Sequence, residues 1–393
     1  MKVLHVVPSY IPAYRYGGSI TATHSLCKAL ADKGVEVSVF TTNIDGDTVL
    51  DVPTHHPQNR DGIQVTYYPV SFMRPYCYSR GLSGALKENL KQFNIIHIHS
   101  VYLYPTFIAA YWCRRYQKPY ILNPFGALDP SMIKLKGRIK KTLYIKFIES
   151  RTIKSAQRIH VASAYEKERL YALGFRVPTA IIPVGLNMSE SYDACALPDF
   201  LEEEYPLLKG KKKVLFLGRL HPKKGCDILA SAFKMIIERT KDVYLVIAGS
   251  GSASYLKKIK GLFRKIGIDR HVFFTGMLLG EKKLSAFYHS DIFVLPSYGE
   301  NFGVAALEAM AAKLPVVITN CVGLSPDVEE YRAGTVIEPD SLSVATAIMN
   351  LLENAPLRES MGQNGKRLVE ERFTWDHVAD KAIKVYEELL RVE

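Results

Sequence analysis

The stretch VLFLGRLHPKKG at residues 214–225 passes from an apolar run directly into a basic loop that contains two glycines. Four consecutive apolar residues followed by Gly predict a buried strand that ends at a turn. In an open parallel sheet, the loops at the carboxyl ends of the strands are where ligands bind. Arg219 and Lys224 can present two cations to one anion from such a loop, and a diphosphate is suited to them.

Short apolar runs alternate with helical patterns on both sides of this stretch, which predicts an α/β fold with parallel sheets. In the first half, strands are expected at 3–7, 35–42, 64–68, 95–99, 120–122, 159–162 and 180–182. In the second half, they are expected at 214–217, 244–248, 272–275, 292–295, 316–318 and 335–337. We therefore expect two Rossmann-like, doubly wound domains that face a central cleft.

The boundary between the two domains is expected where the periodicity is lost, at residues 189–212. This segment contains Pro198, an acidic run at 202–204 and the start of a lysine-rich run at 209–213, which together predict a linker. We expect an N-terminal domain at 1–188, which the C-terminal helix 374–393 joins, and a C-terminal domain at 213–373.

Composition limits the class of protein. The chain has 393 residues, of which 48% are hydrophobic and 23% charged, as in ordinary globular proteins of two or three domains. It lacks the roughly 18 consecutive apolar residues that a spanning helix needs. Its six cysteines form no C-x-x-C pair, so neither a disulfide framework nor a zinc site is indicated. We expect a cytoplasmic protein.

The formal net charge of +12 comes from the first half of the chain. Residues 1–190 carry 24 Lys and Arg against 12 Asp and Glu, whereas residues 191–393 carry 27 of each kind. Within 133–158, nine basic residues face the single acid Glu149 and alternate with apolar ones. This pattern is typical of a basic amphipathic helix on an anionic membrane surface. The alternative interpretation is that the basic residues form a solvated helix face whose apolar side packs on its own domain. A nucleic-acid partner is disfavoured, because the sequence contains no recognisable nucleic-acid-binding module.

A second motif surrounds two glutamates. Glu300 follows a strand, and Glu308 lies about two turns into the helix expected to start near Gly303. The amides of Asn301, Phe302 and Gly303 then lie at a helix N-terminus, which favours an anion. A carboxylate in so apolar a helix as that of Glu308 either reaches solvent or is held by a donor such as a sugar diol.

Together these motifs resemble the retaining glycosyltransferases of family four, the glycosyl transferases group 1, which have the GT-B fold. The resemblance rests on the G-R-L-x-x-x-K-G motif and on two glutamates with seven residues between them. Supporting stretches are FVLPS at 293–297, IAGSG at 247–251 and the early pair Gly17 and Gly18. It covers essentially the whole chain and is more specific in the second half.

The resemblance implies a role for each matching residue. Arg219 and Lys224 would bind the donor diphosphate, Glu300 would contact the transferred sugar, and Glu308 would hold the ribose hydroxyls. The remaining donor-binding residues would be Gly17, Gly18, Asn301, Phe302 and Gly303. No metal or other cofactor is expected, because the cations and helix amides do the work of a divalent ion.

The implied activity is transfer of a hexose from a UDP- or GDP-linked sugar to a glycan or polyprenyl-linked saccharide. The configuration at the anomeric carbon would be retained. Such an enzyme would serve surface polysaccharide synthesis (capsule, O-antigen or exopolysaccharide). It would be cytoplasmic, with peripheral contact to the anionic inner face of the membrane and no nucleic-acid partner.

The first half departs from the family at one position. Many relatives carry a His before the Gly in the loop after the strand at 120–122, and here that position is Phe125. A phenyl ring stacks on a sugar face but cannot donate a hydrogen bond. Asn123, Phe125 and the strand-end His99 are the candidate contacts to acceptor or sugar, whereas His97 is expected to be structural.

Two other functions remain as alternatives. An NAD-dependent oxidoreductase would need G-x-G-x-x-G after its first strand, where this chain has VPSY at 7–10. A non-catalytic sugar-nucleotide-binding protein would tolerate the loss of Glu300 or Lys224, and both residues are present.

Overall fold

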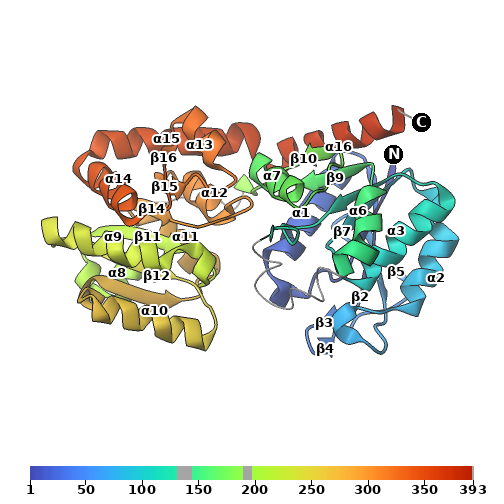
Figure 1. The fold of residues 1–393 in the computed structure, drawn as a ribbon, viewed down its shortest axis with the longest axis horizontal. Coiled ribbons are helices and arrows are strands. Elements are labelled where there is room, and N and C mark those ends of the chain that lie inside the picture. Colours follow the sequence, from blue (N-terminus) through green and yellow to red (C-terminus); the bar gives the residue numbers. More distant parts are fainter. Residues whose placement is uncertain (131–143, 189–196, 392–393) are drawn as a thin grey trace. The chain divides into compact units, whose positions relative to one another are not determined.

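The computed structural model describes residues 1–130, 144–188 and 197–391. The chain divides into two compact units, which are described one at a time (Figure 1). Unit 1 comprises Met1–Gly185 and Trp375–Glu393, and unit 2 comprises Leu186–Thr374. Each unit is built on a largely parallel sheet, so the α/β class expected from the sequence is confirmed.

Unit 1 has an eight-stranded sheet in the order β10-β9-β8-β7-β1-β2-β6-β5. Its strands are β1 (Lys2–Val7), β2 (Glu36–Thr42), β5 (Pro57–Arg60), β6 (Ile63–Tyr68), β7 (Ile95–His99), β8 (Tyr120–Asn123), β9 (Arg158–Val161) and β10 (Thr179–Ile181). A short hairpin joins β3 (Ile44–Asp45) to β4 (Thr48–Val49). The edge strand β5 pairs antiparallel with β6, and the other pairs are parallel. The loops after the parallel strands therefore lie along one edge of the sheet.

Alternate residues of β1 enter two different cores. Val3 and Val7 pack in the core that contains Leu26 of α1, whereas Leu4 and Val6 pack in the core that contains Leu82 of α2. The helices of this unit are η1 (Tyr14–Tyr16), α1 (Gly18–Asp32), η2 (Arg74–Tyr76), α2 (Arg80–Asn89), η3 (Leu90–Gln92), α3 (Tyr104–Tyr116), the π-helix η4 (Ile145–Glu149), α6 (Ser150–Lys154), α7 (Ala164–Ala172) and α16 (Trp375–Arg391). Both faces of the sheet are thus covered, as in doubly wound folds.

The C-terminal helix α16 belongs to unit 1, although the chain between Leu186 and Thr374 forms unit 2. Its residues Val378, Ala382 and Tyr386 are fully buried in the same core as α1. Lys33, which caps α1, makes ion pairs with Asp376 and Asp380 of α16 at 2.7 and 2.8 Å.

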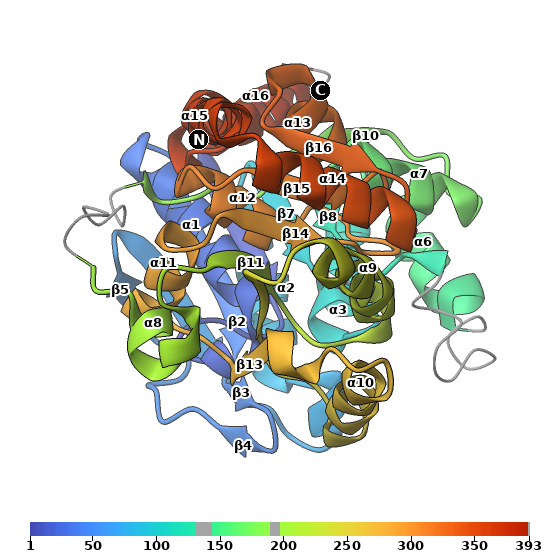
Figure 2. The same ribbon diagram turned by 90° about the vertical axis from the view of Figure 1, so that its left-hand side faces the viewer.

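Unit 2 has a six-stranded parallel sheet in the order β13-β12-β11-β14-β15-β16 (Figure 2). The strands are β11 (Lys212–Leu217), β12 (Val243–Ala248), β13 (Val272–Gly276), β14 (Ile292–Leu295), β15 (Val316–Thr319) and β16 (Gly334–Ile337). The order reverses between β11 and β14, and this reversal is the point where doubly wound sheets bind ligands.

Several helices of unit 2 that follow β11 pack against one another in a continuous series. The helices after β11 are η8 (Pro222–Lys224), α9 (Cys226–Arg239), α10 (Ala253–Lys265), η9 (Asp269–His271), α11 (Gly280–Tyr288), α12 (Val304–Ala311), α13 (Ser325–Tyr331), α14 (Ser341–Glu353) and α15 (Ala355–Arg372). In the series, α14 contacts both α9 and α15, while α9 also packs against α10, and α15 also packs against α12 and α13.

Residues 197–212, which we expected in a linker, fold into unit 2. They form α8 (Phe200–Glu204) and η7 (Pro206–Leu208), and the side chains of Phe200, Leu201 and Leu208 are buried. Lys213 makes ion pairs with Asp199 and Glu202, both at 2.8 Å, which attaches this segment to β11. Residues 189–196, the rest of the expected linker, lie outside the described part of the chain.

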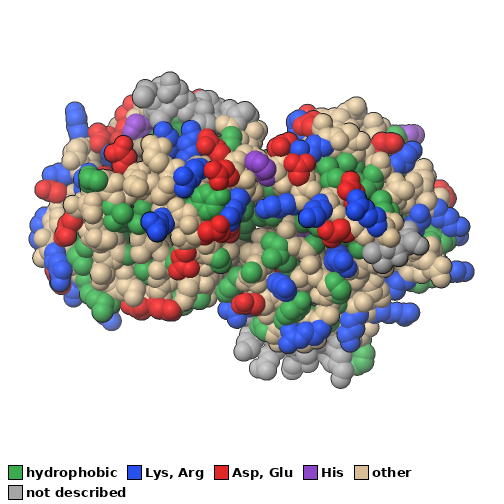
Figure 3. Space-filling view, turned by 90° about the horizontal axis from the view of Figure 1, so that it is seen from above, with side chains coloured by type: hydrophobic (Ala, Val, Ile, Leu, Met, Phe, Trp, Pro, Cys, Tyr) green, Lys and Arg blue, Asp and Glu red, His purple; other side chains and the backbone are tan. Residues whose placement is uncertain are grey.

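Residues 131–143 also lie outside the described part, so the amphipathic helix expected over 133–158 is described only from Tyr144 onward, where η4 and α6 form. Lys and Arg side chains are spread over each unit on the face that Figure 3 shows, rather than gathered in one patch. Among the described residues, no helix is both long and apolar enough to span a bilayer.

Candidate active site

The basic loop after β11 is held in place by a glycine that no other residue can replace without strain. Gly225 has a φ of +68°, and a Cβ atom there would lie 1.9 Å from the Pro296 carbonyl oxygen. The Tyr298 amide donates to the Lys223 carbonyl at 2.8 Å. These contacts fix the loop after β11 against the loop after β14, so the two predicted motifs lie side by side.

Lys224 and Glu300 meet across these loops. The Lys224 ammonium forms an ion pair with Glu300 Oε2, and both side chains are about one-fifth to one-quarter exposed, at 20% and 24%. The Glu300 backbone is fixed as well, because its amide donates to the Cys321 carbonyl at 2.9 Å. Each of these two predicted catalytic residues therefore neutralises the charge of the other.

Arg219 lies in the same loop and differs from Lys224 in its surroundings. It is exposed, and no acidic partner is found for it in the described ranges. Burial, and after it the nearby cations Lys223, Arg219 and Lys224, lowers the pKa of His221 in the same loop. The loop therefore carries an excess of positive potential suited to an anion.

The start of α12 agrees with the helix start expected near Gly303. Gly303 is the N-cap, with a φ of +107°, and the helix begins at Val304. A Cβ atom on Gly303 would lie 2.8 Å from Val322 Cγ1. Phe302 is buried against Phe373, with ring centroids 5.6 Å apart, so this side chain anchors the turn. The Gly303 carbonyl accepts from the amides of Ala306 and Leu307, at 2.9 and 3.1 Å, which closes the first turn of α12. The amides that precede this turn lie at the helix N-terminus, where an anion is favoured.

Glu308 is held by a residue that the sequence did not single out. Lys283 of α11 donates to Glu308 Oε1 at 2.8 Å, and the two side chains are 29% and 22% exposed. The neighbours Leu307 and Ala309 are fully buried. Lys283 adjoins Lys282 in the sequence, and nothing in the pattern distinguishes the two lysines.

In unit 1, the two glycines at the start of α1 leave open space beside the backbone. Gly17 has a φ of +78° and caps the helix, and Gly18 is its first residue. A Cβ atom at either position would meet nothing within 4 Å. A ligand can therefore approach the backbone here, as the resemblance implies.

The three candidate acceptor residues differ in accessibility. His99 is 1% exposed, and its ring is stacked on Phe125 with centroids 5.6 Å apart. Phe125 is 37% exposed and has a φ of +48°. Asn123 is 6% exposed, and its Oδ1 accepts from the Phe125 amide at 3.0 Å. Phe125 thus covers His99, and Asn123 shapes the loop that carries Phe125.

A network of buried histidines lies beneath this loop, and its hydrogen bonds determine the tautomers. His160 Nε2 must donate to the Ile182 carbonyl at 2.7 Å, so its Nδ1 accepts from His97 Nε2 at 3.1 Å. His97 Nδ1 then accepts from the Tyr386 hydroxyl at 2.8 Å. His97 is therefore neutral and structural, as expected.

His5, His97 and His99 lie close enough to suggest a metal site, with one nitrogen of each within 4.8 Å of the others. Both nitrogens of His97 are already used, however, and His5 Nδ1 is hydrogen-bonded to His99 Nε2 at 2.9 Å. A metal would have to displace several of these bonds, so we assign none to this cluster.

Two buried carboxylates of unit 1 hold loops at the carboxyl edge of the sheet. Glu166 accepts from the amides of Gly126 and Ala162, both at 2.7 Å, and Glu149 accepts from the Tyr102 amide at 3.2 Å. Burial raises the pKa of each carboxyl to about 7. The S-x-x-E spacing of Ser163 and Glu166 is a helix-start signal that could have indicated Glu166. Glu149 carries no such signal.

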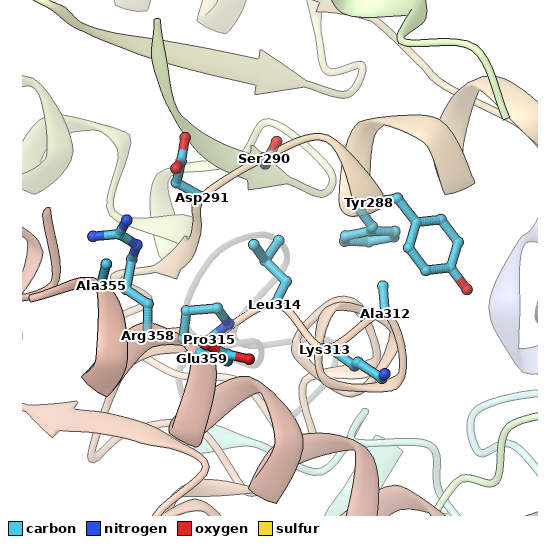
Figure 4. A pocket seen from close by; sticks show the side chains of 11 residues that line it. Tyr288, Ser290, Asp291, Ala312, Lys313, Leu314, Pro315, Ala355, Arg358 and Glu359 are labelled. Atoms are coloured by element: carbon cyan, nitrogen blue, oxygen red, sulfur yellow. The ribbon is translucent and has the colours of Figure 1, made fainter. Parts of the chain in front are cut away.

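A cavity of about 270 Å³ lies at the opposite edge of the unit 2 sheet (Figure 4). Its lining includes Asp291 and Pro315, which directly precede β14 and β15, together with Arg358 of α15. None of the residues predicted to bind the donor lines it. This cavity is at the amino ends of the strands and is separate from the predicted site.

Comparisons with known proteins agree with the geometry. The profile of the family described as Glycosyl transferases group 1 matches residues 199–368, and that of the Glycosyl transferase 4-like domain matches residues 17–185. An uncharacterized glycosyltransferase of Methanocaldococcus jannaschii is 27% identical over 98% of both chains. A phosphatidyl-myo-inositol mannosyltransferase of Mycobacterium leprae is 33% identical over 58% of each.

The solved structure of the Anabaena protein HepE in complex with UDP and glucose has a TM-score of 0.75 and 18% identity. The match covers 99% of this chain and 100% of that one. Likeness at this identity shows the fold, and the expected GT-B fold is confirmed.

Proposed function

The chain belongs to the group 1 glycosyltransferases, and we propose that it transfers a hexose from a nucleotide sugar to a saccharide acceptor with retention at the anomeric carbon. Membership in this family removes the oxidoreductase alternative. The proposal extends from the family to the donor, the stereochemistry and the acceptor.

The observation that carries the proposal is the pairing of charges around the loops after β11 and β14. Lys224 pairs with Glu300 and Lys283 pairs with Glu308, while Arg219 has no acidic partner among the described residues. A donor diphosphate would draw Lys224 away from Glu300 and complete a two-cation clamp with Arg219. Glu300 is then free to accept from a sugar hydroxyl, and Glu308 from the ribose.

The proposed chemistry needs no protein base. The bond between the anomeric carbon and the diphosphate oxygen breaks, and the leaving nucleotide takes its electron pair. An acceptor hydroxyl attacks the oxocarbenium-like carbon from the same face, and its proton passes to the leaving phosphate oxygen. Arg219, Lys224 and the amides of residues 301–303, at the N-terminus of α12, stabilise the charge that develops on the diphosphate. A divalent ion is not required, because these groups supply the positive charge.

The proposed donor is a UDP- or GDP-linked hexose. The Anabaena structure contains UDP and glucose, and the mycobacterial relative is named as a mannosyltransferase. Both names are consistent with a hexose donor.

The proposed acceptor is a glycan or a polyprenyl-linked saccharide used in surface polysaccharide synthesis. The excess of basic residues in 1–190 supports an acceptor at an anionic membrane. The mycobacterial mannosyltransferase, whose name includes the lipid phosphatidyl-myo-inositol, supports the same location. The enzyme would act at the inner face of the cell membrane and bind it peripherally.

Separate roles for the two glutamates test the proposal. Glu308→Gln should weaken binding of both the free nucleotide and the nucleotide sugar, because the ribose is common to both ligands. Glu300→Gln should weaken only the nucleotide sugar, and it should leave free-nucleotide binding intact because Lys224 is released for the diphosphate. Calorimetry with UDP, GDP and their hexose conjugates measures both effects.

Equal losses on both ligands in both variants would contradict these roles. A non-catalytic binding protein is the remaining alternative. It would bind the same ligands but release no nucleotide when wild-type protein is incubated with the nucleotide sugar and saccharide acceptors.

A further inference from the structure

Six aromatic rings of unit 1 form a continuous chain, which we call the aromatic ridge. It consists of Phe72, Tyr78, Tyr104, Tyr76, Tyr144 and Tyr102, in order of contact. Successive ring centroids are 4.7, 4.6, 6.1, 6.4 and 6.0 Å apart. These distances are typical of aromatic pairs in contact.

The ridge lies at the carboxyl edge of the unit 1 sheet. Phe72, Tyr76 and Tyr78 are in the loop after β6, and Tyr102 and Tyr104 follow β7. The Tyr102 hydroxyl donates to the Ala127 carbonyl at 3.5 Å, in the loop that also carries Phe125. The ridge therefore leads toward the residues expected to meet the acceptor.

The rings are accessible to different degrees. Phe72 is 66% exposed, and the five tyrosines are partly exposed. The hydroxyls of Tyr76 and Tyr144 are hydrogen-bonded to each other at 2.8 Å, which fixes these two rings. A partly exposed row of tyrosines with fixed rings offers apolar faces and polar edges at little cost in side-chain entropy.

A second feature, independent of the rings, indicates a polar ligand. Glu149 is 1% exposed, and one carboxylate oxygen accepts from the Tyr102 amide, whereas Oε1 has no hydrogen-bond partner within the described residues. A buried oxygen without a donor is costly. A hydroxyl group supplied by a ligand would satisfy it.

The loop that Glu149 holds is also unusual. Ser100 and Tyr102 have φ values of +74° and +68°, although neither is glycine. Such backbone strain is concentrated at functional sites and persists only where the surroundings enforce it. Here the Glu149 carboxylate and the ring contacts of Tyr102 enforce it.

We propose that the aromatic ridge is an extended subsite for an oligosaccharide acceptor, whose sugar rings stack on the aromatic faces and whose hydroxyls meet the tyrosine hydroxyls and Glu149. The C–H face of a hexose is apolar and its rim is polar, which matches a row of tyrosines better than it matches a lipid chain. This inference rests on the proposed function, because it assigns the acceptor of that reaction to a chain of several sugars.

The test compares saccharides of different length on the full-length protein. The probes are glucose, mannose and N-acetylglucosamine and the linear tetrasaccharides of each, and binding is measured by ligand-observed NMR and calorimetry. At least one tetrasaccharide should bind the wild type more tightly than its monosaccharide. Phe72→Ala should weaken that tetrasaccharide by about five- to tenfold, the loss expected for one aromatic stacking contact.

A second variant and a matched control separate stacking from folding. Tyr104→Leu should show the same loss, and Tyr104→Phe should retain most of the affinity because the ring remains. Tyr111→Ala is the control, since Tyr111 is 43% exposed on α3 and lies outside the ridge. It should leave saccharide binding unchanged. Melting temperatures show which variants are folded, and Phe72 is exposed enough for its replacement to be tolerated.

Several outcomes would overturn the subsite. These are a wild type that binds no saccharide of the panel, tetrasaccharides that bind no tighter than monosaccharides, or full tetrasaccharide affinity in both Phe72→Ala and Tyr104→Leu. A Phe72→Ala variant that loses only its binding to anionic vesicles would assign the ridge to a membrane instead. UDP and GDP affinities, measured on the same samples, report on the donor site. Failure there would contradict the proposed function without involving the ridge.

Discussion

Lys283 is expected to orient Glu308, the glutamate that we propose to hold the donor ribose. Its ammonium is the donor found for Glu308 Oε1, at 2.8 Å. Lys283→Met removes a charge-assisted hydrogen bond, so UDP or GDP affinity should fall about tenfold, which corresponds to about 1.4 kcal/mol. The matched control is Lys282→Met. Lys282 is 63% exposed and makes a long surface ion pair of 3.8 Å with Glu204, so it has no role at Glu308. Calorimetry that finds equal affinities in the two variants would exclude this role.

A substitution at Gly225 tests whether the proposed donor site requires contact between the loops after β11 and β14. Gly225→Ala forces a Cβ atom to within 1.9 Å of the Pro296 carbonyl oxygen, in addition to the strain of a φ of +68°. Gly210→Ala carries the same strain at +66° but meets nothing within 4 Å. We expect Gly225→Ala to lower the melting temperature by several degrees more than Gly210→Ala does. It should also abolish nucleotide binding, and two variants with the same melting temperature and affinity would refute the steric argument.

At the scale of elements, periodicity predicted the strands of both sheets well because buried parallel strands are short apolar runs. The antiparallel edge strand β5, with the sequence PQNR, was missed because its residues are polar and start with Pro. Helix α15 has a weak apolar pattern for a similar reason, because it combines two glycines with many charged residues. Residues 197–212 were predicted to be a linker because many charged residues surround Phe200, Leu201 and Leu208 and interrupt the apolar pattern, although these three side chains are buried.

The candidate donor-binding residues could be named from the sequence, because their motifs are contiguous, and the structure places the two loops that carry them side by side. Lys283 and the aromatic ridge could not, since each depends on contacts between distant elements. His99 illustrates the same limit, because the sequence placed it at a strand end without showing that Phe125 covers it. Spacing identifies which residues can act, and packing decides which of them are accessible.

The buried histidine network should make unit 1 sensitive to acid. Burial, with a smaller effect of His160, lowers the pKa of His5 to about 3, and burial lowers the pKa of His160 to about 4. Burial and neighbouring histidines lower the pKa of His97 and His99 as well. The unfolded chain takes up protons below about pH 6.5, whereas the folded network does not. Stability is therefore fully present above pH 6.5 and is lost as the pH falls toward 4 and 3.

Glu149 and Glu166 make stability depend on pH in the opposite direction. Their pKa values are raised to about 7, so their contribution is present below pH 4.5 and is lost as the pH rises through 7. Between pH 4.5 and 6.5, the gain in stability from four histidines exceeds the loss from two carboxyls. Above pH 6.5 only the loss from the carboxyls remains, so the free energy of unfolding should be highest near pH 6.5 and fall on both sides. Urea unfolding followed by tryptophan fluorescence measures it, because Trp112 and Trp375 both belong to unit 1. Constant stability between pH 6.5 and 4 would contradict burial of a neutral network.

At the scale of the whole molecule, the uneven charge predicts binding to anionic membranes. Binding of the full chain to anionic vesicles should be measurable at low salt and fall steeply as the ionic strength rises. It should drop when Lys136, Arg138, Lys140 and Lys141, which lie outside the described residues, are changed together to Glu. A charge-matched control changes the exposed Lys257, Lys258, Arg264 and Lys265 of α10 instead. Equal loss in both quadruple variants, or no vesicle binding by the wild type, would favour an acceptor away from the membrane.

The central claim is that Arg219 and Lys224 stabilise a departing nucleoside diphosphate. The most direct measurement is the rate of nucleotide release from the preferred nucleotide sugar in the presence of a saccharide acceptor. Lys224→Ala and Arg219→Ala should each lower this rate by about a hundredfold or more, since a pre-organised charge contact in the transition state contributes roughly 3 kcal/mol. Lys223→Ala, the same charge change at the neighbouring position of the loop, should stay within about threefold of the wild type, because we propose that Lys224, and not Lys223, contacts the diphosphate. Wild-type rates in both Arg219→Ala and Lys224→Ala would contradict the account.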